Sequence, residues 1–324
     1  MTCLARLIAG FTTWVLAAVL TPALAQDNYP SRVIRMVVGS AAGSTSDVLA
    51  RQMIPKLSAQ LNNVSVIVEN KIGANGNIGV DFVAKSKPDG YTLMVNTATV
   101  ALSRATGETI GYDLFNDLTP VVLLASGPQW LITTTSLPVN TPAQFIAHLK
   151  ANPDKLSYAS TGNVSYLSTL LFLQMNGLTS VYVPYKDRAN AIVDLVSGRT
   201  QFFIPDTTLV MPLAREKRIK VLAVTSLKRY SLLPDVPTLD ETVMPGFEMA
   251  NWFGVLTPKQ TPPAIIKRIN AEMTKLMSDA ELKTKLAQEG LELRGSTPEE
   301  YDVLIKKELE RWTRVIKTAG VKFD

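Results

Sequence analysis

The amino-acid sequence predicts an α/β protein built of two lobes, and two features of the chain lead to this prediction. Short β-branched runs alternate with helical patterns through most of its 324 residues, an alternation typical of α/β folds with largely parallel sheets. Strand-like runs also end and restart near Ser126-Gly127-Pro128 and again near Pro245-Gly246. Two such crossings fit a middle section inserted into a discontinuous first lobe. We therefore expect lobe 1 in residues 26–127 and 247–324, and lobe 2 in residues 128–246.

The clearest elements lie in the first half of the chain. Strands are expected over residues 33–38, 64–68 and 91–95, with a later one over 221–224, and helices over 47–61 and 141–150. In the first helix, four apolar residues recur at every fourth position and predict one buried stripe: Leu49, Met53, Leu57 and Leu61. Pro55 lacks a backbone donor and crowds the preceding turn, so we expect it to kink or shorten this helix.

The section after Pro262-Pro263 reads as helices without obvious strands between them. Two sequences there, SDAE at 278–281 and TPEE at 297–300, have the form of a capping box. In a capping box a hydroxyl and a carboxylate bond reciprocally to the backbone of the first helical turn. Gly290 and Gly320 stand where these helices are expected to end.

The first 25 residues are predicted to be a cleaved export signal. Arg6 supplies a basic start, residues 7–20 are mostly apolar, and Ala23-Leu24-Ala25 has the A-x-A form of a cleavage site. The apolar run is short for a membrane span, and a retained anchor is the alternative. Cleavage would remove Cys3, the sole cysteine, and with it any disulfide, cysteine nucleophile or thiolate metal site.

The charge of the chain does not indicate a nucleic-acid partner. The sequence has 33 Lys and Arg against 28 Asp and Glu, a net charge of +5. The basic residues are scattered, apart from short groups such as Lys217-Arg218 and Lys306-Lys307. Nucleic-acid binding needs a concentrated basic stripe. We expect these side chains to be solvated surface, on a monomer that binds no nucleic acid.

The chain offers little for catalysis. His148, the sole histidine, lies on an amphipathic helix beside Lys150, so a Ser-His-Asp arrangement lacks its base. The turn GSAAGSTSD at 39–47 contains neither G-x-S-x-G nor the G-K-[ST] ending of a phosphate loop. A Ser-Lys pair stays open as an alternative, although no S-x-x-K occurs in this turn. We predict no catalytic residue.

Metal and cofactor sites are not expected either. The glycines of the segment 72–79 do not form G-x-G-x-x-G, and close backbone approach or helix packing is favoured over ligand contact for Gly73, Gly76 and Gly79. The isolated carboxylates are expected to form caps or turns, and they are Asp113, Asp117, Asp235 and Asp240. We predict no metal and no cofactor.

Small, hydroxyl-rich turns follow three strand-like runs: residues 43–46 (GSTS), 96–99 (NTAT) and 160–165 (STGNVS). In α/β lobes such turns gather at the carboxyl edges of parallel strands and direct helix N-termini toward one crevice. Unpaired N–H groups and the positive end of each helix dipole attract anions there. Any one turn could equally be a helix cap. Three of them, in a chain without catalytic groups, favour a binding cleft with a carboxylate as its natural guest.

A series of short motifs follows in order along the chain. They are YPSRVIRMVV (29–38), GSTSDVLAR (43–51), VEN (68–70), GANGNIG (73–79), KPDGYTL (87–93), YAS (158–160), VPYK (183–186), LAVTS (222–226), LPDVPT (233–238) and WFGVL (252–256). The series resembles the solute-binding proteins of tripartite tricarboxylate transporters, the Bug family. The resemblance implies a periplasmic-binding-protein type II-like fold with two α/β lobes joined by a hinge. It also implies a periplasmic protein that closes on a small carboxylate and delivers it to a two-component membrane permease.

Carried over by position, the resemblance implies ligand contacts from both lobes. Those of lobe 1 are Ser44, Thr45 and Thr97, and those of lobe 2 are Thr161, Gly162, Asn163, Ser165, Tyr185 and Asp206. Aromatic acids, dicarboxylates and tricarboxylates are all compatible with neutral, hydroxyl-lined turns. A ligand-sensing co-receptor of a sensor kinase and a periplasmic hydrolase are the alternative functions.

Two departures from the family pattern bear on the ligand. Ser40-Ala41-Ala42 replaces a turn that is usually rich in proline and phenylalanine, which alters the size and polarity of the pocket. Asp187-Arg188 follows the VPYK motif where the family usually continues with glycine. Arg188 could clamp a second carboxylate bidentately, or pair with Asp187 or solvent, and the structural interpretation is favoured.

Overall fold

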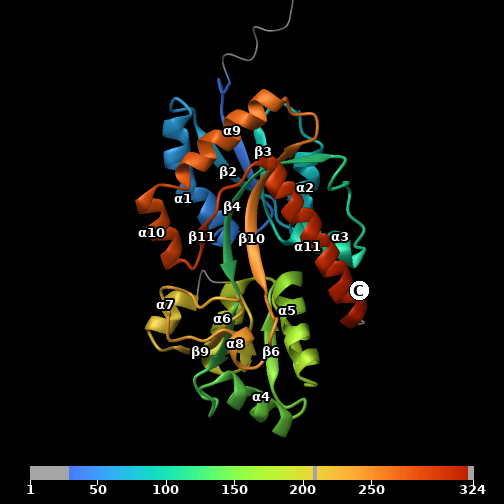
Figure 1. Ribbon diagram of the computed structural model, residues 1–324, viewed down its shortest axis with the longest axis vertical. Coiled ribbons are helices and arrows are strands. Elements are labelled where there is room, and N and C mark those ends of the chain that lie inside the picture. Colours follow the sequence, from blue (N-terminus) through green and yellow to red (C-terminus); the bar gives the residue numbers. More distant parts are fainter. Residues whose placement is uncertain (1–28, 207–209, 320–324) are drawn as a thin grey trace, which may run out of the picture.

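The computed structural model describes residues 29–206 and 210–319 and shows two lobes, one above the other in Figure 1. The upper one, lobe 1, contains a six-stranded sheet in the order β11-β4-β10-β3-β1-β2. Its strands are β1 (Ile34–Val38), β2 (Val66–Asn70), β3 (Thr92–Thr97), β4 (Leu118–Pro128), β10 (Ala250–Pro258) and β11 (Glu292–Leu293). Its helices are α1 (Thr45–Gln60), the 3₁₀ turn η1 (Ala74–Gly76), α2 (Asn77–Ala84), α3 (Thr99–Thr106), α9 (Pro263–Leu276), α10 (Ala280–Gln288) and α11 (Pro298–Ala319).

The lower one, lobe 2, contains a five-stranded sheet in the order β7-β6-β8-β5-β9. Its strands are β5 (Trp130–Thr134), β6 (Ser157–Ser160), β7 (Val181–Pro184), β8 (Phe202–Phe203) and β9 (Ile219–Val224). Its helices are α4 (Pro142–Ala151), α5 (Gly162–Met175), α6 (Arg188–Ser197), α7 (Val210–Arg215) and α8 (Leu239–Thr242). The two-lobed α/β architecture expected from the sequence is confirmed. The lobe borders after residues 127 and 246 stay predictions.

Both sheets are mixed, so the expectation of largely parallel sheets is wrong. β1 pairs in parallel with β2 and β3, and β6 pairs in parallel with β7 and β8. In contrast, β10 runs antiparallel to β3 and β4, and β5 runs antiparallel to β8 and β9. The chain leaves lobe 1 by β4, enters lobe 2 by β5 and returns through β10. The passage of the chain between the lobes brings strands together in opposite directions. A helical crossover within one lobe instead gives parallel neighbours.

Two closely spaced connections join the lobes. β4 ends at Pro128 and β5 begins at Trp130, so one residue, Gln129, separates a strand of each sheet. The buried hydroxyl of Thr225 accepts a hydrogen bond from Gln129 N at 2.8 Å and donates to the Met249 carbonyl at 2.5 Å. Thr225 thereby ties the outgoing connection to the returning one.

The helix α1 presents one apolar face to the sheet of lobe 1. The predicted stripe is confirmed, because each of its members is at most 1% exposed: Leu49, Met53, Leu57 and Leu61. Pro55 lies inside the helix, which continues to Gln60. Of the two expected effects of Pro55, the shortening is therefore wrong, and the kink stays a prediction. Burial of the stripe on both sides of Pro55 offsets the backbone hydrogen bond that proline cannot make.

The two predicted capping boxes have different outcomes. The box at 297–300 is confirmed: Thr297 N donates to Glu300 Oε2 at 2.9 Å, and Glu300 N donates to Thr297 Oγ1 at 3.1 Å. The box at 278–281 is wrong, because Asp279 caps α10 and accepts from Leu282 N at 2.8 Å. Ser278 Oγ instead donates to a carbonyl at the end of α9.

In the rest of the C-terminal section, one expectation is confirmed and one strand is present that the sequence did not predict. Gly290 follows α10 with a φ of 76°, as expected for a helix end. The short strand β11, which pairs with β4, was not expected between α10 and α11. Gly320 and the predicted export signal lie outside the described residues.

Glycines allow the first turn of lobe 1 to meet the segment before α2. An ideal Cβ on Gly39 would lie 2.7 Å from both Cα and O of Gly76, and one on Gly79 would lie 3.1 Å from Gly39 Cα. Because the obstructing atoms are backbone, a side chain at Gly39 would require the backbone to shift, and one at Gly79 would be tightly crowded. The interpretation of Gly76 and Gly79 as sites of close backbone approach is confirmed.

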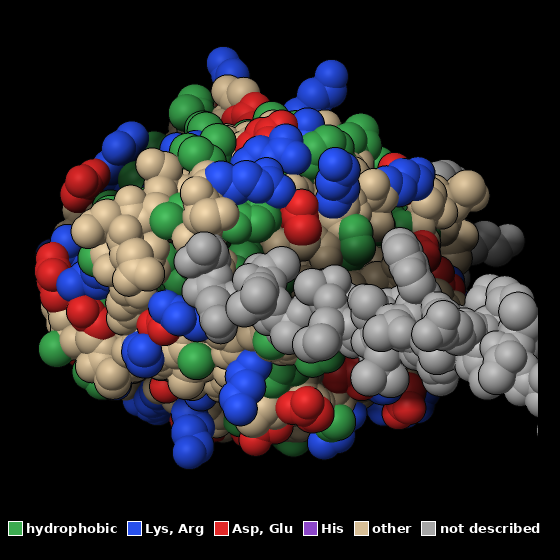
Figure 2. Space-filling view, turned by 90° about the horizontal axis from the view of Figure 1, so that it is seen from above, with side chains coloured by type: hydrophobic (Ala, Val, Ile, Leu, Met, Phe, Trp, Pro, Cys, Tyr) green, Lys and Arg blue, Asp and Glu red, His purple; other side chains and the backbone are tan. Residues whose placement is uncertain are grey.

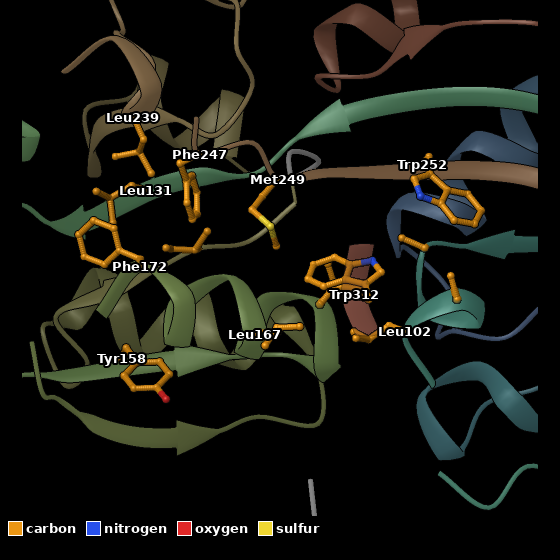
Figure 3. Close-up of a cluster of buried hydrophobic side chains, with 14 of the residues drawn as sticks. Leu102, Leu131, Tyr158, Leu167, Phe172, Leu239, Phe247, Met249, Trp252 and Trp312 are labelled. Atoms are coloured by element: carbon orange, nitrogen blue, oxygen red, sulfur yellow. The ribbon is translucent and has the colours of Figure 1, made fainter. Parts of the chain in front are cut away.

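One buried apolar cluster continues across the junction of the lobes. It includes Leu102 of α3, Leu167 of α5 and Trp312 of α11, and Figure 3 shows the Trp312 ring near both leucines. Trp312 is only 1% exposed. The neighbouring Arg311 donates to the Glu248 carbonyl in the connection that returns from lobe 2. The C-terminal helix of lobe 1 therefore also packs against lobe 2.

The surface carries charges of both signs. On the face seen in Figure 2, Lys and Arg side chains are interspersed with Asp and Glu. Across the described structure such residues pair, as Lys56 does with Asp279 at 2.8 Å. Within residues 29–206 and 210–319, no helix combines the length and apolar character needed to cross a membrane.

Candidate ligand-binding site

Three serine hydroxyls form a cluster at the first turn of lobe 1, between β1 and α1. Ser40 Oγ lies 2.6 Å from Ser44 Oγ and 2.7 Å from Ser46 Oγ. Ser44 is the N-cap of α1, and its hydroxyl accepts from Asp47 N. Ser40 and Ser44 are partly exposed, whereas Ser46 is buried. Since a hydroxyl can donate or accept a hydrogen bond, this cluster can donate hydrogen bonds to an anion at the start of α1.

The carboxylate of Asp47 holds this turn in place. Asp47 is 2% exposed and accepts from Gly43 N, Arg51 Nε and Asn70 Nδ2, each at 2.9 Å. Burial by itself would raise the pKa of this carboxyl, but the hydrogen bonds from Arg51, Gly43 and Asn70 outweigh burial and lower the pKa below its ordinary value of 3.8. Asp47 is therefore a structural anion that fixes the turn carrying the serine hydroxyls.

A side chain of lobe 2 crosses the junction to this turn. Arg188, the first residue of α6, donates from Nη1 to Thr45 Oγ1 at 2.9 Å and from Nη2 to Asp206 Oδ2 at 3.0 Å. The side chains of Arg188 and Asp206 are only 18% and 19% exposed. Asp187, which the sequence offered as a partner of Arg188, is the N-cap of α6 and accepts from Asn190 N at 2.9 Å. Arg188 thus lies between the lobes.

Asp206 connects Arg188 to the hinge strand β10. Asn251 donates from Nδ2 to Asp206 Oδ2 at 3.1 Å, and its Oδ1 accepts from Ala98 N at 3.3 Å. Ala98 is the N-cap of α3 and has no capping side chain. A continuous series of polar contacts therefore runs from the start of α1, through lobe 2, to the start of α3. Thr97, just before this cap, lies with its hydroxyl 3.0 Å from that of Thr99.

The start of α5 makes a second contact between the lobes. Asn163 donates from Nδ2 to Glu108 Oε1 at 2.5 Å, and the other oxygen of Glu108 accepts from Asn77 Nδ2 at 3.2 Å. Thr161 is the N-cap of α5 but makes no side-chain capping bond. An ideal Cβ on Gly162 would lie 3.9 Å from Asn75 Oδ1 of lobe 1. The N-terminus of α5 therefore faces η1 and the segment after α3.

Two of the expected contact residues point into lobe 2. Ser165 is 4% exposed, and its hydroxyl donates to the Ile204 carbonyl at 2.8 Å. The Tyr185 hydroxyl donates to Asp194 Oδ2 at 2.7 Å, and burial together with this carboxylate raises the pKa of Tyr185 to about 12. The structure thus brings together Thr45 and Asp206 through Arg188, with Ser44 next to Thr45 in the same turn, and places Thr161, Gly162 and Asn163 at a second contact. It gives Ser165 and Tyr185 partners within their own lobe.

Two residues at the junction were not expected from the sequence. Glu108 follows the end of α3 by two residues, and Asn251 precedes the apolar run of β10. Neither belongs to a hydroxyl-rich turn, which was the signal used. A polar residue at the start of the returning strand, just before its apolar run, is a usable signal for Asn251. Nothing comparable marks Glu108.

The described residues offer no obvious catalytic or metal centre. His148 lies on α4, at the end of lobe 2 that is remote from the junction in Figure 1. Within residues 29–206 and 210–319, no group of three or more His, Cys, Asp or Glu side chains is placed to hold a metal ion. Two surface cavities, of about 360 and 350 Å³, lie away from the turns described above. One is lined by residues of α10 with Arg215 and Leu232, the other by residues of α11 with Phe115 and Lys259.

Two α/β lobes joined by paired connections, with polar turns facing one another across the junction, define a bilobal solute-binding protein. The chain belongs to the family described as tripartite tricarboxylate transporter family receptor, whose model matches residues 49–321. The family is one of receptors.

Three solved structures illustrate the similarity. The Rpa4515 protein of R. palustris with adipate is 35% identical with a TM-score of 0.85, and the alignment covers 91% of this chain and 99% of that one. The periplasmic binding protein BugD is 31% identical with a TM-score of 0.84, over 91% and 99% of the two chains. MatC of Rhodopseudomonas palustris with bound malate is 28% identical with a TM-score of 0.81, over 89% and 100%. The resemblance to the Bug proteins is confirmed.

Proposed function

We propose that this protein is a periplasmic receptor that captures a small organic carboxylate between its lobes and delivers it to a tripartite tricarboxylate-type membrane transporter. The observation that carries the proposal is the convergence of the starts of α1, α3 and α6 on one series of contacts, from Thr45 through Arg188, Asp206 and Asn251 to Ala98. Hydroxyls, N–H groups and one guanidinium meet there, and carboxylates bind such donors well. The similar proteins with adipate and malate support this ligand class.

The proposed ligand contacts are the first-lobe residues Ser44, Thr45 and Thr97 together with Thr161, Gly162, Asn163 and Asp206 of lobe 2. Ser165 and Tyr185 complete the set proposed from the family pattern, and a ligand contact from either would require its present hydrogen bond to open. Residues on both sides of one junction can hold a ligand only while the lobes are together. Capture therefore proceeds by lobe closure, without a covalent step.

A thermal-shift screen tests the capture step. A ligand that binds only the folded protein raises the apparent unfolding temperature by mass action, and at 100 times its Kd it adds about 2.7 kcal/mol. We expect at least one acid from a panel of aliphatic and aromatic mono-, di- and tricarboxylates to raise the unfolding temperature, while its neutral amide does not. A panel in which acids and amides behave alike would contradict carboxylate capture.

The delivery step needs a cellular test. Deletion of the gene should abolish uptake of the bound acid and leave its metabolism intact once the acid is inside the cell. If uptake continues unchanged while the transcriptional response to the acid disappears, the receptor serves a sensor kinase instead.

A further inference from the structure

The guanidinium of Arg188 lies where the backbone already favours negative charge. Arg188 is the first residue of α6, and its Nη1 contacts Thr45, the first residue of α1. These helices have 10 and 16 residues, and the N-terminal end of a helix carries a partial positive charge. A cation placed at two such ends is unfavourable unless an anion accompanies it.

The carboxylates near Arg188 already have other hydrogen-bond donors. Asp187 accepts from Asn190 N at 2.9 Å and from Asn190 Nδ2 at 2.7 Å. Asp47 is held by Gly43, Arg51 and Asn70. Asp206 forms the ion pair with Arg188 at 3.0 Å and also accepts from Asn251. Asp187 and Asp47 thus fix the turns, and Asp206 balances the charge of Arg188. The partial positive charge at the starts of α1 and α6 remains to attract a further anion.

Two of the acceptors of the guanidinium differ in charge. Nη2 donates to the carboxylate of Asp206, whereas Nη1 donates to the neutral hydroxyl of Thr45. Both bonds are charge-assisted because the guanidinium is charged, but only an anionic acceptor such as a carboxylate adds the attraction between opposite charges. A ligand carboxylate can therefore replace Thr45 at Nη1. The partly exposed hydroxyls of Ser40 and Ser44, on the same turn as Thr45, can donate to that carboxylate as well.

We propose that Arg188 is the residue with which the receptor distinguishes a negatively charged ligand from a neutral one. Its guanidinium holds one carboxylate at the start of α1 while it stays paired with Asp206. The inference rests on the proposed function and adds to it a specificity-determining residue. Because Arg188 belongs to lobe 2 and the serine hydroxyls belong to lobe 1, a carboxylate bound by both joins the lobes. A neutral ligand of the same shape gains less binding free energy when the lobes close in the same way.

The test combines variants with ligand pairs. Isothermal titration calorimetry would measure binding of adipate, malate, benzoate and citrate, and of the amide of each acid that binds, to wild type, Arg188→Gln and Arg188→Lys. The matched control is Arg199→Gln, since Arg199 lies in the same lobe, is 76% exposed and pairs with Asp194. We expect Arg188→Gln to bind the acid about 10- to 100-fold more weakly. Arg188→Lys should recover part of the loss, and Arg199→Gln should bind as wild type does.

The readout that separates recognition from a structural role is the preference for acid over amide. Arg188→Gln should lower this preference, because only the acid uses the charge. Equal weakening of acid and amide, or unchanged binding of the acid, would overturn the role of Arg188 while leaving the proposed function intact. A wild-type protein that binds none of the four acids would contradict the proposed function, and the role of Arg188 would fall with it.

Discussion

The side chain of Asn163, at the start of α5 in lobe 2, donates to Glu108 of lobe 1 at 2.5 Å. Glu108 also accepts from Asn77, which is 6% exposed. The contact therefore joins the start of α5 in lobe 2 to a residue of lobe 1 that is itself hydrogen-bonded to a buried side chain. Together with the contact of Arg188 with Thr45, it holds the junction at two separate places.

Removal of this contact should weaken the closed arrangement. Glu108→Ala takes away one charge-assisted hydrogen bond between the lobes, worth about 1.5–3 kcal/mol at most. We expect ligand affinity to fall by about 3- to 30-fold, because a smaller fraction of the protein is then closed. Calorimetry measures the affinity, and small-angle X-ray scattering of the ligand-free protein should show a larger radius of gyration. Glu310→Ala, an exposed carboxylate of lobe 1, is the control. Equal affinities in both variants would mean that the contact does not support closure.

Because α11 packs across the junction, removal of its buried Trp312 side chain should cause a large loss of stability. Trp312 is 1% exposed and belongs to the cluster that contains Leu102 and Leu167. Trp312→Ala should lower the free energy of unfolding by about 3–5 kcal/mol, the usual cost of removing a buried aromatic ring. Val303→Ala, on the same helix but 49% exposed, should change it by less than about 0.5 kcal/mol. Urea denaturation checks both values. Similar losses in the two variants would contradict the packing described.

The close approach at Gly39 predicts an intolerant position. In Gly39→Ala the new Cβ would lie 2.7 Å from Gly76 backbone atoms, which cannot move aside without shifting the first turn or η1. We expect a loss of about 1–3 kcal/mol in stability together with loss of ligand binding. Gly107→Ala introduces a Cβ with nothing within 4 Å at a φ of 74°, so it should cost stability through backbone strain but retain binding. Denaturation and calorimetry on both variants distinguish these effects, and normal binding by Gly39→Ala would contradict the account.

Asp47 predicts a pH dependence of stability. Its folded-state pKa lies below the unfolded value of 3.8, so the unfolded state takes up a proton first as the pH falls. The stabilisation is therefore fully present above about pH 5 and is lost as the pH falls through the folded-state pKa. Asp47→Asn should cost about 1–3 kcal/mol at pH 7, and the difference from wild type should shrink toward pH 3.

A surface carboxylate supplies the comparison for this prediction. Asp302 forms an exposed i,i+4 pair with Lys306, so Asp302→Asn should differ from wild type by no more than about 1 kcal/mol at any pH. Urea denaturation at several pH values measures both differences. A constant difference for Asp47→Asn across this range would show that the charge of Asp47 does not stabilise the fold.

Local patterns predicted the elements that surround the first turn. The four-residue apolar spacing predicts the buried face of α1, and the close backbone approach expected of Gly76 and Gly79 is confirmed. The helix is not shortened at Pro55, because the tertiary burial of Leu57 and Leu61 is invisible to a rule about backbone hydrogen bonds. The mixed sheets were missed for a related reason. Whether β10 pairs antiparallel with β3 depends on how the chain returns from lobe 2.

The contacts between the lobes could not be read from local sequence. Arg188 and Thr45 are separated by 143 residues, and Asn251 and Ala98 by 153. Hydroxyl-rich turns indicated which edge of each sheet faces the junction. They carried no information about the partner that each residue meets there. For this reason the sequence does not predict that Arg188 pairs with Asp206 and Thr45, or that Glu108 lies at the junction.

The central claim is that a carboxylate is held between the two lobes, and a crystal structure of the complex with the acid that binds most tightly in calorimetry tests it directly. The account predicts one carboxylate of the ligand within hydrogen-bonding distance of the turn at Ser44 and Thr45 in lobe 1 and of Arg188 in lobe 2. A ligand bound to one lobe alone, or in one of the two surface cavities, would contradict it.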